Sequence, residues 1–155
     1  MQRRHLLLAA LAGRAAPAWA HHGWGGFDQD RPLYLQGTAR KVAWKNPHVE
    51  LDVETPAGLA LPADLPRRAV PPQSAGVDAS HVLANTRLPT RQDRVWHVEL
   101  APLTRMQAWQ VPELHDGDRV EVIGYTSNGE KGEPVLRAEY LFVGGKAYGL
   151  RSSPA

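Results

Sequence analysis

The sequence predicts a small all-β domain, and three features of the chain carry this prediction. Short runs of alternating apolar and polar residues recur along it, as where Val49, Leu51 and Val53 alternate with Glu50 and Asp52. Turn-forming glycine, proline and asparagine residues separate these runs. The chain has no cysteine, so an apolar core must stabilise the fold without disulfides, thiolate metal ligands or a cysteine nucleophile.

Residues 1–20 have the parts of an export signal. Arg3 and Arg4 supply the positive start, residues 6–12 an apolar run, and residues 18–20 a small-x-small cleavage site. This apolar run is far shorter than the ~20 residues that span a bilayer. We therefore expect a periplasmic or secreted protein that is not inserted in the membrane after signal cleavage. The general secretory and twin-arginine routes both stay open.

Removal of the signal changes the charge balance of the chain. Residues 1–20 contain three arginines and no acid, so 18 Lys+Arg become 15 against 16 Asp+Glu, a net charge of −1. The isoelectric point of about 9.2 belongs to the whole chain. The mature protein therefore gives no reason to expect nucleic acid as a partner.

Residues 21–32 are rich in glycine, and we expect a flexible N-terminal arm there. A single β-domain follows over residues 33–150. Its first strand begins at Leu33 and changes face along its length, which predicts a β-bulge at Gly37 or at the Arg40–Lys41 pair. A corner at residues 45–47 leads into the second strand, since Pro47 fixes its own backbone and removes a donor.

Residues 55–93 contain six prolines and little periodicity. So long a segment without secondary structure is unusual inside a compact domain. We expect a disordered or loosely packed hairpin insertion.

The remaining elements follow in quick succession. The third strand spans Arg94–Leu100, and Pro102 opens a short helix. A fourth strand begins at Arg119, and a fifth spans Val135–Val143. The fifth strand is expected to present one apolar face, made of Leu136, Ala138, Tyr140 and Phe142. Residues 146–150 are expected to pair at an edge.

Five strands, a bent first strand and one short helix between the third and fourth strands match the five-stranded Greek-key barrel called the OB-fold. An open meander of the same strands is the alternative. Folds of this kind host many unrelated functions, so the architecture alone assigns none.

Three segments resemble one known family. They are residues 20–24 (Ala-His-His-Gly-Trp), residues 35–48, which end in Trp-Lys-Asn-Pro-His, and residues 117–124. Together they resemble the small exported bacterial proteins of the domain of unknown function family 6152. The resemblance implies an exported small β-domain and no particular activity, and it leaves out the long insertion.

The histidines are the best candidates for a binding site. After cleavage His21 offers its α-amine and a ring nitrogen to one metal ion, and His22 adds a second ring. Without thiolates, such a site suits Cu(II), with Ni(II) or Zn(II) behind it. His48 and His97 are candidate remote ligands. The alternative is that the two terminal histidines have no fixed partner.

A second group of polar residues lies on the solvent face of the predicted sheet. His48, Glu50 and Asp52 share one face of the second strand, and His97 and Glu99 the matching face of the third. We expect the register that sets Glu50 opposite His97 and His48 opposite Glu99, since a shift by two residues would oppose Glu50 and Glu99. These residues are expected to form either solvated charge pairs or a metal or anion site.

No motif of a known enzyme class is found, and we do not expect catalysis. The sequence thus predicts an exported binding domain that takes a divalent transition metal. The alternative is a metal-free module that binds an envelope protein or a small polar ligand.

Overall fold

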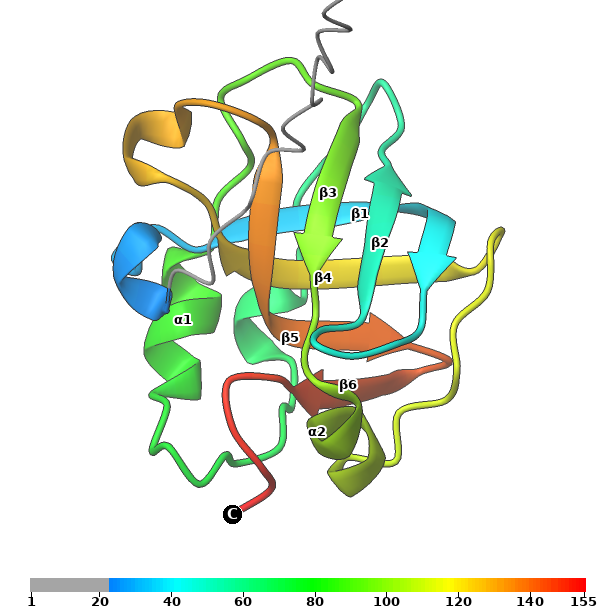
Figure 1. Cartoon of the computed structure of the whole chain (residues 1–155). Helices are drawn as coiled ribbons and strands as arrows, with labels where there is room; N and C mark the ends of the chain where they lie inside the picture. Colours follow the sequence, from blue (N-terminus) through cyan, green and yellow to red (C-terminus); the bar gives the residue numbers. More distant parts are fainter. Residues whose placement is uncertain (1–22) are drawn as a thin grey trace, which may run out of the picture.

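Strand β1, Leu33–Ala43, pairs on one side with β2, Glu50–Glu54, and on the other with β4, Arg119–Tyr125. The computed structural model describes residues 23–155. β3, Val95–Glu99, pairs with β2, and β5, Val135–Val143, pairs with β4. Parallel pairing of β3 with β5 closes the five strands into a barrel (Figure 1). The OB-like barrel is confirmed, and the open meander is excluded.

Strand β1, which pairs with both β2 and β4, contains a β-bulge. Its pairing with β2 shifts between Arg40 and Ala43, and Lys41 has a positive φ of 48°. The bulge predicted at the Arg40–Lys41 pair is therefore confirmed. Gly37 permits close crossing of the two strands, because a Cβ atom there would lie 2.2 Å from the carbonyl oxygen of Glu54.

Helix α2, Leu103–Ala108, is the helix expected between the third and fourth strands, and it follows Pro102 directly. Its Met106 is completely buried in the barrel core, so the helix covers the lower end of the barrel (Figure 1). The corner between β1 and β2 is tied to this helix, since Asn46 Oδ1 accepts a hydrogen bond of 3.2 Å from the Leu103 N–H. The edge strand is also confirmed: β6, Lys146–Gly149, pairs with β5.

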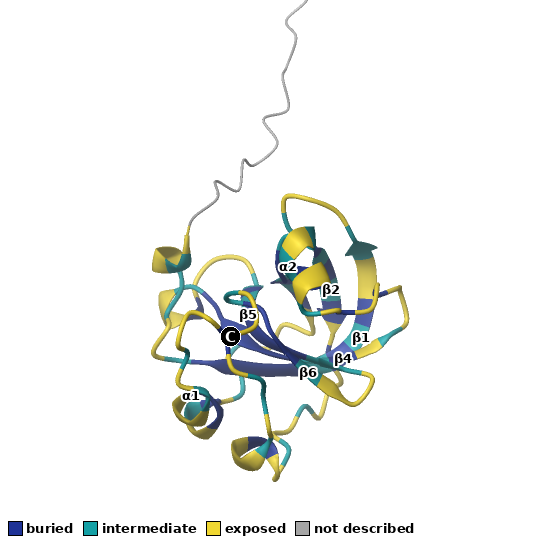
Figure 2. Cartoon of the chain, turned by 90° about the horizontal axis from the view of Figure 1, so that it is seen from below, coloured by how far each residue is buried: buried dark blue, intermediate teal, exposed yellow. Residues whose placement is uncertain are grey.

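The barrel core is apolar and continuous. Trp96 is its largest fully buried side chain, and it packs among aliphatic residues from all five barrel strands. Figure 2 shows the buried segments gathered along the strands and the exposed ones in the connections. Among the helices described, none is long and apolar enough to span a membrane.

Strand β5 does not present the single apolar face that its sequence predicts. Ala138 and Tyr140 pair with the consecutive residues Gly124 and Ile123, so Glu139 is an extra residue in the strand. This bulge reverses the side-chain alternation. Leu136 and Ala138 therefore point into the barrel, whereas Tyr140 and Phe142 belong to a second apolar cluster.

The insertion at residues 55–93 is well packed, and the expectation of a disordered or loose hairpin is wrong. It contains the 3₁₀ turn η2, Leu65–Arg67, and helix α1, Ala79–Asn85. Asp78 caps α1 by accepting a hydrogen bond of 2.9 Å from the His81 N–H. The second apolar cluster joins the insertion to the outside of the barrel through Tyr34, Leu65, Val82, Leu83, Ile123 and Tyr140. Two further 3₁₀ turns are η1, Trp24–Gly26, and η3, Asn128–Glu130.

The second cluster makes the insertion part of the folding unit, and Leu65 tests this. Leu65 is 2% exposed, whereas Leu61 in the same segment is 41% exposed. We expect Leu65→Ala to lower the free energy of unfolding by about 3 kcal/mol, because it leaves a cavity under the insertion. Leu61→Ala is the matched control and should cost less than about 0.5 kcal/mol. Urea unfolding measures both, and equal small losses would show that the insertion does not stabilise the barrel.

Candidate functional site

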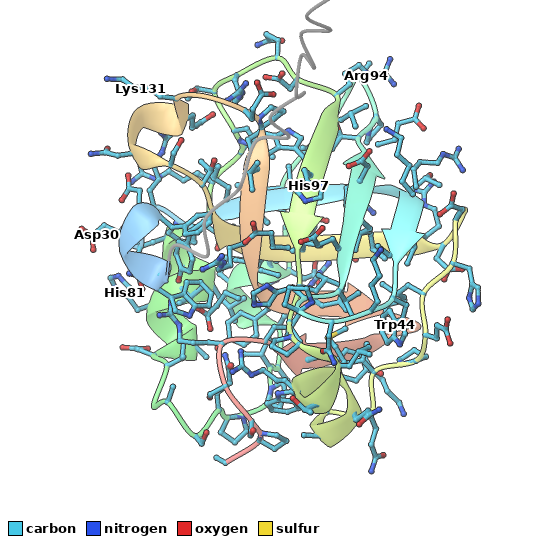
Figure 3. All side chains as sticks on the ribbon, viewed as in Figure 1. Asp30, Trp44, His81, Arg94, His97 and Lys131 are labelled. Atoms are coloured by element: carbon cyan, nitrogen blue, oxygen red, sulfur yellow. The ribbon has the colours of Figure 1, made fainter. Side chains whose placement is uncertain are left out.

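Outward side chains of three adjacent strands form what we call the polar face: Glu50 and Asp52 of β2, His97 and Glu99 of β3, and Arg137 of β5. The alternation along each strand sends these groups away from the core. Figure 3 shows His97 near the middle of this surface. In OB-folds the surface of the second and third strands is a common ligand-binding face.

The predicted register between β2 and β3 is wrong by two residues. Glu50 lies opposite Glu99 and not opposite His97, and His97 lies opposite Asp52. His48, predicted opposite Glu99, lies beyond the end of β2. The two facing carboxylates are the like-charge pair that sequence reasoning treated as unfavourable.

Arg137 explains why this register is stable. Its Nη2 atom lies 2.6 Å, and its Nε atom 2.9 Å, from Glu99 Oε2, and both side chains are about 15% exposed. The guanidinium group compensates the charge of Glu99, so Glu50 faces a neutralised carboxylate. Sequence reasoning missed Arg137, because nothing in the chain indicated that β5 pairs in parallel with β3.

His97 lies between two carboxylates. Its Nδ1 atom is 3.3 Å from Asp52 Oδ1, and its Nε2 atom is 3.7 Å from Glu50 Oε2. Asp52 also forms an ion pair of 3.1 Å with Lys41 Nζ. The polar face is therefore a set of cross-strand charge pairs, with His97 at its centre.

The predicted metal ligands are not brought together among the described residues. Within residues 23–155 no three His, Asp or Glu side chains are arranged to hold a metal ion. His48 lies four residues before Asp52, the partner of His97, so the two histidines are separated by about 13 Å along the strands. His21 and His22 lie outside the described residues.

The other histidines lie elsewhere. His81 is exposed on α1, well away from His97 in Figure 3, and His115 is exposed in the turn before β4. Neither was expected to be a ligand.

The N-terminal arm is docked on the barrel from residue 23 onward, so the expectation of a flexible arm is wrong for this part. The Trp24 ring contacts two guanidinium groups, with Arg151 at 4.0 Å and Arg137 at 5.7 Å from its centroid. Arg137 also lies 4.5 Å from the centre of the Phe27 ring. Such cation–π contacts hold the arm beside the polar face, since Arg137 belongs to both.

Arg151 is held in turn by a buried carboxylate. Its Nη2 atom lies 2.7 Å from Glu139 Oε2, and Gln73 Nε2 donates a hydrogen bond of 2.8 Å to Glu139 Oε1. Burial raises the pKa of Glu139, and the Arg151 and Gln73 contacts offset this only in part. The signal that sequence reasoning could have used is an acidic residue inside the apolar run of β5.

A hollow of 310 Å³ adjoins the arm and the polar face. Phe27, Val135 and the Glu99–Arg137 pair line part of it. Thr126 also lines it, and its buried Oγ1 atom has no hydrogen-bond partner within residues 23–155. Phe27 and Val135 give this hollow an apolar wall and the Glu99–Arg137 pair a charged one, so it suits a small ligand that has both apolar and polar groups.

A family model matches the first third of the chain: Family of unknown function (DUF6152), over residues 9–60. Residues 9–60 are thus similar to this family of unknown function. The resemblance indicated by the His-His arm and the Trp-x-Asn-Pro-His corner is thereby confirmed. Comparisons with curated proteins and with solved structures found no match.

The matched residues, 9–60, include the arm, β1, the corner and β2. They therefore contribute Glu50, Asp52 and the docked Trp24. Their partners His97, Arg137 and Arg151 come from later in the chain.

Arg137→Gln tests whether Arg137 sets the register of the polar face. We expect a loss of about 2 kcal/mol in the free energy of unfolding, because Glu99 would be left facing Glu50 without compensation. Adding Glu99→Gln should recover part of this loss. Lys41→Gln is the control, since Lys41 is 83% exposed and its pair with Asp52 is worth less than about 1 kcal/mol. Urea unfolding of Arg137→Gln, Glu99→Gln, the double variant and the Lys41→Gln control measures the coupling, and strictly additive effects would contradict it.

Trp24→Ala tests the docking of the arm. The Asp28 N–H donates a hydrogen bond of 2.8 Å to the Thr126 carbonyl oxygen, which should protect it from exchange. We expect this amide to exchange at least about tenfold faster in Trp24→Ala, while Trp24→Phe keeps a ring for the guanidinium groups and stays close to wild type. Hydrogen exchange followed by NMR is the measurement. Unchanged protection in Trp24→Ala would show that the rings do not hold the arm.

Proposed function

We propose that this chain is an exported cell-envelope protein that binds a divalent transition metal ion through its mature N-terminus. Cu(II) is the preferred ion, with Ni(II) and Zn(II) weaker. His21 contributes its α-amine and ring, and His22 a second imidazole. Binding and not catalysis is proposed, and the periplasm or the exterior is the proposed location.

The docking of the arm is the observation that carries this proposal. Trp24 stacks on Arg137 and Arg151, and His21 precedes Trp24 by three residues, a reach of at most about 10 Å. An anchored chain end loses less conformational freedom on binding than a free one. The anchor therefore favours a metal site at the edge of the polar face.

The chemistry of the donors supports the same reading. Within residues 23–155 no three His, Asp or Glu side chains form a metal-binding group, and the proposed site takes its main ligands from His21 and His22. An amine and imidazoles are the nitrogen ligands that Cu(II) prefers. Either His97 or His48 is the proposed remote ligand. His97 has the stronger support, because Asp52 Oδ1 lies 3.3 Å from its Nδ1 atom and orients the ring, as outer carboxylates do in many metal sites, whereas its Nε2 atom is 3.7 Å from Glu50, beyond hydrogen-bond distance.

Titration of the processed protein with Cu(II) by calorimetry tests this function, after mass spectrometry confirms that the chain begins at His21. We expect tight one-to-one binding that weakens at least about a hundredfold in His21→Ala, because both the ring and the orientation of the amine are lost. His97→Ala should weaken it by about tenfold.

Two controls sharpen the result. His115→Ala removes an exposed histidine elsewhere and should leave the affinity unchanged. One extra residue before His21 blocks the α-amine chelate and should lower the affinity as much as His21→Ala does. Tight binding that survives both His21→Ala and the extra residue would overturn the proposed site.

The second candidate is a metal-free module that binds an envelope protein or a small polar ligand. The hollow beside the arm favours it, since Phe27 offers an apolar wall and the Glu99–Arg137 pair offers charged groups. Binding by such a module does not require the N-terminal histidines. Weak Cu(II) binding in every variant would therefore support it over the metal site.

A further inference from the structure

A second hollow, of 340 Å³, lies outside the barrel where β1, β4 and the β5–β6 hairpin meet the insertion. It shares no lining residue with the polar face or with the hollow beside the arm. Gln36, Glu121 and Phe142 are neighbours in its floor, because Gln36 pairs with Glu121 and Glu121 with Phe142 across the sheet. Arg68 of the insertion forms one wall.

Two cations at this hollow have no counter-charge. Arg119 and Lys146 both line it, both are exposed, and neither forms an ion pair within residues 23–155. The mature chain has a net charge of about −1, so an excess of positive charge here is local.

The one carboxylate in the lining is compensated from two sides. Arg68 Nη1 lies 2.6 Å from Glu121 Oε2, and the buried Tyr34 hydroxyl donates a hydrogen bond of 2.5 Å to the same oxygen. Burial, together with the hydrogen bond to Glu121, raises the pKa of Tyr34, so the phenol stays protonated and remains a donor. Arg68 Nε also lies 3.0 Å from Oδ2 of Asp64, which is 62% exposed and is not part of the lining. Within the lining the charges of Arg68 and Glu121 cancel, and Arg119 and Lys146 make the net charge positive.

An apolar surface lies next to these cations. The Phe142 ring has the Arg68 guanidinium over it at 5.1 Å, and Val143 and Ala147 continue the lining. A fixed ring beside free cations suits a ligand with an anionic head and an apolar body.

We propose that this hollow is a binding site for a small organic anion. The head, a carboxylate or a phosphate, pairs with Arg119 and Lys146, and the apolar body packs on Phe142. The Tyr34–Glu121–Arg68 chain of hydrogen bonds fixes the floor before the ligand arrives. This site is independent of the metal site proposed above.

Four probes separate the contributions of head and body, with binding followed by NMR chemical-shift changes of the processed protein. Benzoate and phenyl phosphate carry both parts, benzamide lacks the charge, and inorganic phosphate lacks the body. We expect both complete probes to shift the amides around Phe142 and Lys146 in a saturable way. Benzamide and inorganic phosphate should bind at least about fivefold more weakly. Phenyl phosphate binding more tightly than benzoate would identify a phosphate head, and the reverse a carboxylate.

The double variant Arg119→Gln/Lys146→Gln should weaken the complete probes at least about tenfold. Arg87→Gln/Lys45→Gln is the matched control: it removes the same charge from exposed positions outside the hollow and should leave affinity within about twofold. Equal losses in both double variants, or equal binding of all four probes, would overturn the site. Since none of these residues belongs to the metal site, Cu(II) binding should stay unchanged in both.

Discussion

The bulge at Glu139 is the constraint on which the rest of the structure depends. One extra residue in β5 reverses the alternation of its side chains, so Leu136 and Ala138 fill the barrel before the bulge, whereas after it Leu141 points into the barrel and Tyr140 faces the insertion. The strand is thereby shared between two apolar clusters. Glu139 itself is completely buried, and its contacts with Gln73 and Arg151 tie the insertion and the C-terminal segment to the barrel.

From this buried carboxylate a chain of contacts extends to the N-terminal arm. Arg151 bonds Glu139 on one side and covers the Trp24 ring on the other. Arg137, two residues before Glu139 in β5, makes the same two kinds of contact. It pairs with the carboxylate of Glu99 and also faces the Trp24 ring. Two arginines from the end of the chain thus hold a tryptophan from its beginning, and both use carboxylates that orient them.

The two proposed sites differ in how the fold prepares them. The proposed metal site would take its ligands from His21 and His22, and the barrel would contribute the docked Trp24 that follows them. The anion site is built from a floor whose carboxylate is already compensated, which leaves Arg119 and Lys146 to act on a ligand. Since they share no residue, either can be present without the other.

The sequence by itself determined the barrel, and local physics explains why. Alternation in β2, β3 and β4, the Arg40–Lys41 bulge and the helix after Pro102 all depend on residues close together in the chain. The candidate metal ligands were also predicted from a local feature, the adjacent His21 and His22 at the predicted mature N-terminus. The family match over residues 9–60 covers the part of the chain that contains His21 and His22.

Tertiary structure alone decided the features that need distant partners. The register of β2 against β3 depends on Arg137, which reaches Glu99 only because the barrel closes between β3 and β5. The packing of the insertion depends on Tyr140, which the Glu139 bulge turns outward. Both features depend on contacts between residues about 40 or more positions apart in the chain. No local sequence pattern specifies such contacts, because they stabilise the protein only once the barrel has formed.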